Sequence, residues 1–221
     1  MFIHEMFQQK PCVFSVEVFP PKKAGAAEET LYPVLRELCT LGPDYISVTY
    51  GAGGGTAGQS TAKIASYIKN GLHVEALAHL TCVNSTRVQV EETLTRLRED
   101  LPRRMDFLHA SDLAKAIAQT GGFGVAGACY PEGHVESPSL KADVESLRYK
   151  AEAGVSHLIT QLFFDNVSYY RFLNMARKAG ISLPVQAGIM PIVSKRQIER
   201  TVALSSASLP PQFTKMISRY D

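Results

Sequence analysis

Glu17, His79 and Gln161 each lie within a short run of β-branched and other apolar residues. Glu17 falls on the polar face of its run, shortly before Pro20-Pro21, where a carboxylate would be partly desolvated. Desolvation favours the protonated carboxyl, so we predict that Glu17 is a general acid near neutral pH. The alternative is a rim carboxylate that reaches solvent or pairs with a lysine.

A second group of polar side chains follows another apolar run. Tyr130 and His134 lie in one loop, where an aromatic ring and an imidazole could stack on a planar cofactor and hydrogen-bond it. Asp143, Ser146 and Lys150 follow at helical spacing on roughly one face. Asp143 could therefore meet a ribose hydroxyl and Lys150 a phosphate. An ordinary solvated helix face would have the same spacing.

Other interpretations of these residues stay open. Gln161 is flanked by aromatic residues and could hydrogen-bond a heteroaromatic ring, or it could fill the interior beside a neighbouring polar group. His79 could be a hydrogen-bonded core residue. Together with Glu17 and His134 it could also form a two-histidine, one-carboxylate metal site, which would indicate a metal-dependent hydrolase.

Residues 53–58 read GGGTAG and formally match a dinucleotide-binding fingerprint. The acidic partner of that fingerprint should end the next strand, whereas Glu75, the only candidate, begins it. We therefore interpret the glycines as a loop that passes close to a ligand or as an ordinary surface loop.

Alternating strands and helices must position these residues. Strand patterns occur at residues 13–19, 45–49, 76–81, 125–130, 157–163 and 185–190. Helical patterns occur at residues 26–41, 59–70, 87–99, 111–119, 140–153, 167–179 and 194–205. Ser111, Ser139 and Ser194 are predicted N-caps, and Gly154 and Gly180 are predicted helix ends. This alternation predicts parallel strands joined by right-handed crossovers.

Polar side chains near the carboxyl ends of many strands favour a barrel, because a doubly wound sheet gathers such groups at one switch point. They are Glu17, Ser47, Thr49, His79, Thr81, Gln161 and Gln186. We predict an α/β fold, a TIM-type (β/α)8 barrel that residues 1–221 form as a single domain. No strand separates the helices at 87–99 and 111–119, and only a short tail follows Ser205. We interpret these breaks as one internal strand and the C-terminal strand missing from this sequence, with a natural deletion as the alternative.

Composition argues against several classes of protein. The 221 residues include 23 basic and 21 acidic side chains without blocks of like charge, so nucleic acid and anionic membranes are not expected partners. No apolar run approaches the roughly 20 residues of a membrane span, and the first residues lack a signal-peptide pattern, which predicts a cytoplasmic protein. Four widely spaced cysteines are predicted to be buried free thiols: Cys12, Cys39, Cys82 and Cys129.

Six motifs in order along the chain resemble the methylenetetrahydrofolate reductase family: FSVEVFPP at 14–21, SVTYGA at 47–52, AHLTC at 78–82, HASDL at 109–113, YPEGH at 130–134 and ITQLFFD at 159–165. The resemblance covers nearly the whole chain. It implies a β/α barrel that holds FAD, accepts a hydride from NADH or NADPH, and reduces 5,10-methylenetetrahydrofolate to 5-methyltetrahydrofolate. It further implies a homo-oligomer or a complex with partner subunits, one of which could replace the nicotinamide nucleotide as donor.

The same resemblance assigns roles to single residues. It implies that Glu17 is the acid that protonates the folate so that its methylene bridge opens. The implied cofactor-binding residues are Thr49, Tyr50, Ala52, His79, Asp100, Ala110, Tyr130, His134, Asp143, Ser146 and Lys150. The implied substrate-binding residues are Gln161, Gln197 and Asp100, and no metal is implied.

The chain departs from the family pattern at several positions. The family has a strand ending in Leu-Arg-Gly-Asp before Leu-Pro, whereas here Arg98-Glu99-Asp100 follows a predicted helix. His109 stands where the family usually has Tyr, and Tyr149 where some members have Arg. These departures leave open a non-catalytic subunit that binds folate or flavin without turnover.

Overall fold

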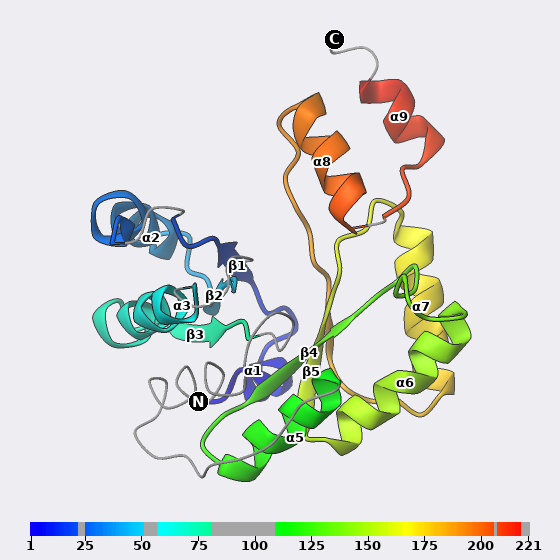
Figure 1. The fold of residues 1–221 in the computed structure, drawn as a ribbon, viewed down its shortest axis with the longest axis horizontal. Coiled ribbons are helices and arrows are strands. Elements are labelled where there is room, and N and C mark those ends of the chain that lie inside the picture. Colours follow the sequence, from blue (N-terminus) through cyan, green and yellow to red (C-terminus); the bar gives the residue numbers. More distant parts are fainter. Residues whose placement is uncertain (22–24, 51–56, 81–108, 206, 218–221) are drawn as a thin grey trace. The chain divides into compact units, whose positions relative to one another are not determined.

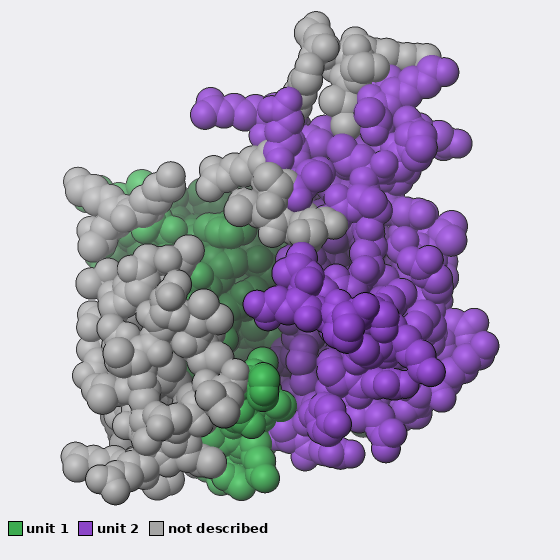
Figure 2. Space-filling model, turned by 45° about the vertical axis from the view of Figure 1, so that its right-hand side comes forward, with its two compact units in different colours: residues 1–123 green, residues 124–221 purple. Residues whose placement is uncertain are grey.

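The computed structural model describes residues 1–21, 25–50, 57–80, 109–205 and 207–217. The chain divides into two compact units, residues 1–123 and residues 124–221, which are coloured separately in Figure 2. Each unit contains a parallel sheet whose strands alternate with helices along the chain (Figure 1).

The first unit is built on a three-stranded parallel sheet in the order β1-β2-β3. Its strands are β1 (Ser15–Val18), β2 (Tyr45–Val48) and β3 (Glu75–Ala78). The register pairs Glu17 with Ser47, and Ser47 with Leu77. The helices are α1 (Ile3–Gln9), α2 (Tyr32–Cys39), α3 (Ala57–Ser66) and α5 (Ala110–Thr120), with π-helical turns η1 (Ala27–Leu31) and η2 (Tyr67–Gly71).

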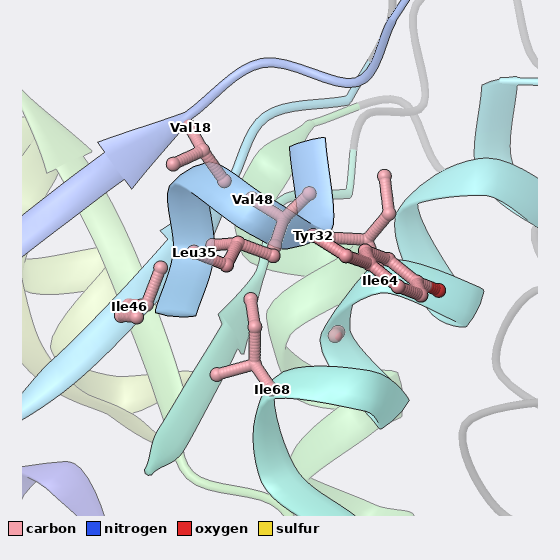
Figure 3. Close-up of a cluster of buried hydrophobic side chains, with 8 residues drawn as sticks. Val18, Tyr32, Leu35, Ile46, Val48, Ile64 and Ile68 are labelled. Atoms are coloured by element: carbon pink, nitrogen blue, oxygen red, sulfur yellow. The ribbon is translucent and has the colours of Figure 1, made fainter. Parts of the chain in front are cut away.

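The core of the first unit lies where one face of this sheet packs on α2, α3 and η2 (Figure 3). Val18 of β1 and Val48 of β2 meet Leu35 of α2 and Ile64 of α3, and each of these side chains is buried. Burying an aliphatic side chain of this size stabilises the fold by roughly 1.5–3 kcal/mol. Because side chains alternate along a strand, this packing leaves Glu17 on the opposite face of β1.

The second unit is built on a sheet in the order β4-β5-β6, also parallel. Its strands are β4 (Val125–Cys129), β5 (Val155–Thr160) and β6 (Val185–Gln186). Its helices are α6 (Leu140–Glu152), α7 (Asn166–Lys178), α8 (Lys195–Ser205) and α9 (Pro211–Ile217). Buried side chains between the sheet and its helices include Cys129, Val144, Leu147, Leu158, Phe172 and Ala176.

Local sequence signals set several helix ends of the second unit. The Ser139 hydroxyl accepts the backbone N–H of Ala142 at 3.1 Å, and the Ser194 hydroxyl accepts that of Gln197 at 3.2 Å. In both cases the donor is three residues after the serine, which confirms the two predicted N-caps. Gly154 and Gly180 follow α6 and α7 with φ of 96° and 82°. These left-handed conformations confirm the two glycines as helix ends.

Three local predictions are wrong. Ser111 is not an N-cap: α5 begins at Ala110, because the Asp112 carboxylate accepts the N–H of the preceding cap residue His109 at 2.8 Å. β6 is shorter than the predicted 185–190, since the N–H of Gly188 donates to the Thr160 hydroxyl rather than to a strand partner. Among the predicted buried thiols, Cys12 is exposed, Cys39 half-buried and Cys129 buried, while Cys82 lies outside the described residues.

The helices α1 and α9 are not predicted by the sequence patterns, since seven residues give too few turns for a 3.6-residue period to stand out. The predicted helix at 87–99 lies outside the described residues. No helix in the described ranges is long and apolar enough to cross a membrane.

The predicted alternation and parallel pairing of strands are confirmed, but the sheets are not closed into a barrel. Within the described residues, β1–β3 and β4–β6 form separate three-stranded sheets. A closed barrel needs every strand to be paired on both edges. The internal strand that we predict to be missing falls between β3 and β4 along the chain.

Candidate functional site

Four of the predicted site residues occupy equivalent places in the fold. Thr49, His79, Tyr130 and Gln161 are each the first residue after a strand. Thr49, His79 and Gln161 each donate their N–H to the carbonyl of the last residue of the neighbouring strand, at 3.0, 2.9 and 2.7 Å. The acceptors are Val18 of β1, Val48 of β2 and Cys129 of β4. A last backbone bond therefore holds each of these residues at the carboxyl end of its sheet, which is where α/β folds bind ligands.

In the first unit, Glu17 contacts two of these neighbours. The Ser47 hydroxyl donates to Glu17 Oε2 at 3.4 Å, and His79 Nε2 lies 3.4 Å from the same oxygen. Ser47 is buried, whereas the side chains of Glu17 and His79 keep 45% and 35% of their surface exposed. The side chain of Glu17 thus keeps nearly half of its surface in contact with solvent. The reason is that this face of β1 is exposed, as Phe19 at 70% also shows.

The other predicted residues of the first unit are more scattered. The carbonyl of Thr49 accepts the Thr61 hydroxyl of α3 at 3.0 Å, and the adjacent Tyr50 is half-buried. Ala110 is the first residue of α5 and is exposed. Two predicted residues, Ala52 and Asp100, lie outside the described residues, as do most of the glycine-rich segment 53–58 and Thr81.

In the second unit the structure brings Tyr130, His134, Asp143 and Lys150 together. The Tyr130 and His134 rings meet edge to face with centroids 4.7 Å apart, and Lys150 Nζ lies 5.9 Å from the Tyr130 ring centroid. The N–H of His134 donates to Asp143 Oδ2 at 3.3 Å. Lys150 Nζ donates to the carbonyl of Ala128 at 2.6 Å. One strand end and one face of α6 therefore build a single polar cluster.

Burial sets the electrostatics of this cluster. Asp143 is 7% exposed, and desolvation raises the pKa of its carboxyl, while the His134 N–H and the charge of Lys150 act in the opposite direction. Desolvation also lowers the pKa of Lys150 and raises that of the Tyr130 phenol. The ion pairs of the described residues do not include one between Asp143 and Lys150.

Asp143 and Lys150 each have one hydrogen-bond partner and attract each other without forming an ion pair, so part of the cost of desolvating their charges remains. A ligand with a hydroxyl for Asp143 and an anionic group for Lys150 would offset that cost through charge-assisted hydrogen bonds. The ring of Tyr130 and the imidazole of His134 would flank an adjacent planar group. The donor set therefore fits a nucleotide that carries a ribose, a phosphate and an aromatic ring.

Three further predicted residues make local contacts. The Ser146 hydroxyl donates to the carbonyl of Asp143 at 2.6 Å. Oε1 of Gln161 accepts the N–H of Leu162 at 2.9 Å, which leaves its amide N–H2 group for a ligand. The amide of Gln197 accepts the N–H of Val193 at 2.9 Å and donates to the carbonyl of Pro191 at 3.0 Å. Gln197 thus orders the loop before α8.

Sequence reasoning missed contacts that join distant parts of the second unit. The Glu132 carboxylate accepts hydrogen bonds from Ser208, 76 residues away, and the ring of Phe164 stacks on that of Phe213. Phe163 likewise stacks on Tyr169, with centroids 5.0 Å apart. Paired aromatic residues after β5 were a visible signal for packing there, but no local pattern marks Ser208 as a partner of Glu132.

The described residues give no support to the metal-site alternative. No three His, Cys, Asp or Glu side chains within them are grouped so as to hold a metal ion. Glu17 and His79 contact each other in the first unit, and His134 belongs to the cluster in the second.

Comparison with known proteins agrees with the motifs. A sequence model of the family described as methylenetetrahydrofolate reductase matches residues 2–105 and 97–221, two segments that overlap where the strand and helix alternation breaks. The 5,10-methylenetetrahydrofolate reductases of Pectobacterium carotovorum and Escherichia coli K12 are each 34% identical over 94% of this chain, and over 73% and 74% of their own lengths. Methylenetetrahydrofolate reductase (NADH) 1 of Arabidopsis thaliana is 32% identical over 96% of this chain and 40% of its own length. These relatives are oxidoreductases by name, and the chain belongs to the methylenetetrahydrofolate reductase family.

Proposed function

We propose that this protein reduces 5,10-methylenetetrahydrofolate to 5-methyltetrahydrofolate with a bound flavin, FAD, and with NADH, NADPH or a partner subunit as the electron donor. Family membership supports the reaction. The observation that carries the cofactor proposal is that buried Asp143 and half-buried Lys150 form no ion pair with each other and lie beside the rings of Tyr130 and His134. A nucleotide cofactor would use all four groups.

Within this proposal each residue has a separate task. Asp143 accepts a ribose hydroxyl, Lys150 holds a phosphate, and Tyr130 and His134 flank the rest of the cofactor. The family resemblance supports further cofactor-binding residues, which we propose residue by residue: Thr49, Tyr50, Ala52, His79, Asp100, Ala110 and Ser146. FAD would supply the hydride transfer itself.

The substrate residues would act on the folate and the nicotinamide. Gln161 offers its amide N–H2 group to either ring, and Gln197 and Asp100 complete the substrate site. Glu17 donates a proton to the folate, which makes the carbon of its methylene bridge electrophilic. The nearly half-exposed carboxyl of Glu17 can regain that proton from water, and His79 and Ser47 hold its Oε2 oxygen.

We also propose that both sheets belong to one β/α barrel formed by residues 1–221. Support comes from the strand order, since each sheet adds its strands consecutively and neither reverses as a doubly wound sheet does at its switch point. A compact chain of this length should show a radius of gyration of about 17 Å in small-angle X-ray scattering. A clearly larger value would indicate two units that move independently and would overturn the single domain.

The visible absorption spectrum of the purified protein, before and after NADH is added without oxygen, tests the proposed reaction. A flavin band that bleaches on addition of NADH supports the redox function. A protein that stays colourless, also after incubation with FAD and with FMN, would overturn it. Metal analysis and a folate-binding titration would then distinguish a hydrolase from a non-catalytic subunit.

A further inference from the structure

A carboxylate in the loop between Tyr130 and His134 is held by a residue near the end of the described chain. The N–H of Ser208 donates to Glu132 at 3.1 Å from Oε2 and 3.3 Å from Oε1, and the Ser208 hydroxyl donates to the same Oε2. Both oxygens of Glu132 are therefore engaged by one residue. Hydrogen bonds to a charged acceptor are the stronger kind and fix the direction of the side chain.

A second contact joins the same two parts of the unit. The Phe164 ring stacks on the Phe213 ring of α9, with centroids 5.2 Å apart and planes at 25°. Phe164 lies three residues after Gln161, in the loop that follows β5. Residues 207–217, here called the clamp, thus contact the loop after β4 and the loop after β5. Both of these loops carry predicted site residues.

The loop after β4 contains a tight turn. Gly133 adopts φ 91°, and its N–H donates to the carbonyl of Tyr130 at 3.0 Å. Glu132, in the middle of this turn, carries the contact to the clamp, while Tyr130 and His134 on either side of it meet each other and Asp143. A carboxylate occupied by Ser208 does not itself bind the cofactor, but it sets where its two neighbours lie.

We propose that Glu132 is a positioning residue: its bonds to Ser208 of the clamp hold the turn that carries Tyr130 and His134 in the geometry that binds the cofactor. This inference rests on the proposed flavin function. It makes cofactor affinity depend on a residue 76 positions further along the chain, through hydrogen bonds rather than through direct contact with the ligand.

The inference is tested by FAD titration of Glu132→Ala, Ser208→Ala and the double variant in the full chain. Glu132→Ala should raise the Kd for FAD about tenfold, the effect of one strong hydrogen bond. Ser208→Ala should have a smaller effect, because its backbone N–H remains, and the double variant should match Glu132→Ala. Glu145→Ala, which removes an exposed carboxylate from α6, is the matched control and should bind FAD like the wild type.

Hydrogen exchange of the flavin-free protein gives a readout that does not depend on the cofactor. In Glu132→Ala the amides of residues 130–137 should exchange faster, while those of β5 and α7 keep their wild-type rates. Unchanged exchange in this loop, an unchanged Kd, or additive effects in the double variant would overturn the positioning role. If the wild type does not bind FAD while the loop still responds, the proposed function fails and the contact to the clamp stands.

Discussion

Replacing Glu17 with Gln exchanges an ionisable carboxyl for an amide that cannot act as the acid, and it keeps the shape of the side chain. The two contacts of the carboxylate, to the Ser47 hydroxyl and to His79 Nε2, are both 3.4 Å long, and 45% of the side-chain surface is exposed. An amide oxygen can still accept from Ser47. We therefore expect the free energy of unfolding to change by less than about 1 kcal/mol. A large loss of turnover would then report the missing proton.

The size of that loss follows from what a positioned acid contributes. Proton donation by a side chain typically accelerates a step by about 10²–10⁴-fold, or about 2.7–5.5 kcal/mol of activation free energy. In the proposed mechanism only reduction of the folate uses the proton of Glu17. Reduction of the flavin by the nicotinamide nucleotide does not. Glu17→Gln should slow the folate step at least about 100-fold and leave flavin binding and flavin reduction nearly unchanged.

Anaerobic stopped-flow absorbance separates the two steps. Bleaching of the flavin after mixing with NADH reports the first, and return of the band after the reduced enzyme meets methylenetetrahydrofolate reports the second. Glu29→Gln, the same change at an exposed position of η1, is the control and should leave both rates unchanged. Equal slowing of both steps in Glu17→Gln would refute the assignment of Glu17 as the acid.

Two other substitutions test the second unit. Asp143→Asn should stabilise the flavin-free protein and weaken FAD binding by about 10–100-fold, because it removes a buried charge together with an ionised acceptor. Burial raises the pKa of Asp143 in the folded protein above its ordinary value of 3.8. The wild type should therefore lose stability as the pH rises from 3.8 through the pKa of the folded state. Thermal unfolding measured across this pH range should show a smaller fall in Tm for Asp143→Asn than for the wild type. Gly188→Ala would place a Cβ 2.4 Å from the Thr160 carbonyl oxygen. This substitution should destabilise the fold by about 1–3 kcal/mol, which corresponds to a fall in Tm of roughly 2–12 °C. An unchanged Tm would contradict the close approach of Gly188 to Thr160.

The apolar patterns in the sequence predicted the six strands because such patterns follow directly from which side chains are buried. All six predicted strands exist, and they pair in parallel as the alternation with helices requires. Each predicted strand nevertheless extends past the observed carboxyl end, as at Thr49 and Gln161. The strand pattern of the sequence continues there because the first residue after the strand still donates its N–H to the neighbouring strand. The sequence pattern does not show whether such a residue belongs to the strand or only makes one further backbone hydrogen bond beyond it.

The cluster of the second unit was predictable only in part. Helical spacing puts Asp143 and Lys150 on one face of α6, and a short loop brings His134 to them. The bond from Lys150 to the Ala128 carbonyl and the bond from Ser208 to Glu132 depend on how separate elements pack. Contacts across 22 and 76 residues leave no local pattern that sequence reasoning could use.

The environments of two carboxylates indicate different tasks. Asp143 is 7% exposed on a helix whose neighbouring acid Glu145 is 58% exposed, so burial singles out one position of α6. Burying the carboxylate in that place costs stability, which agrees with the ligand-binding role that we propose for Asp143. Glu17 keeps 45% of its side-chain surface exposed and lies beside an imidazole. In the proposed mechanism one acid holds a ligand and the other donates a proton, a division of roles that differences in environment can produce between two like groups.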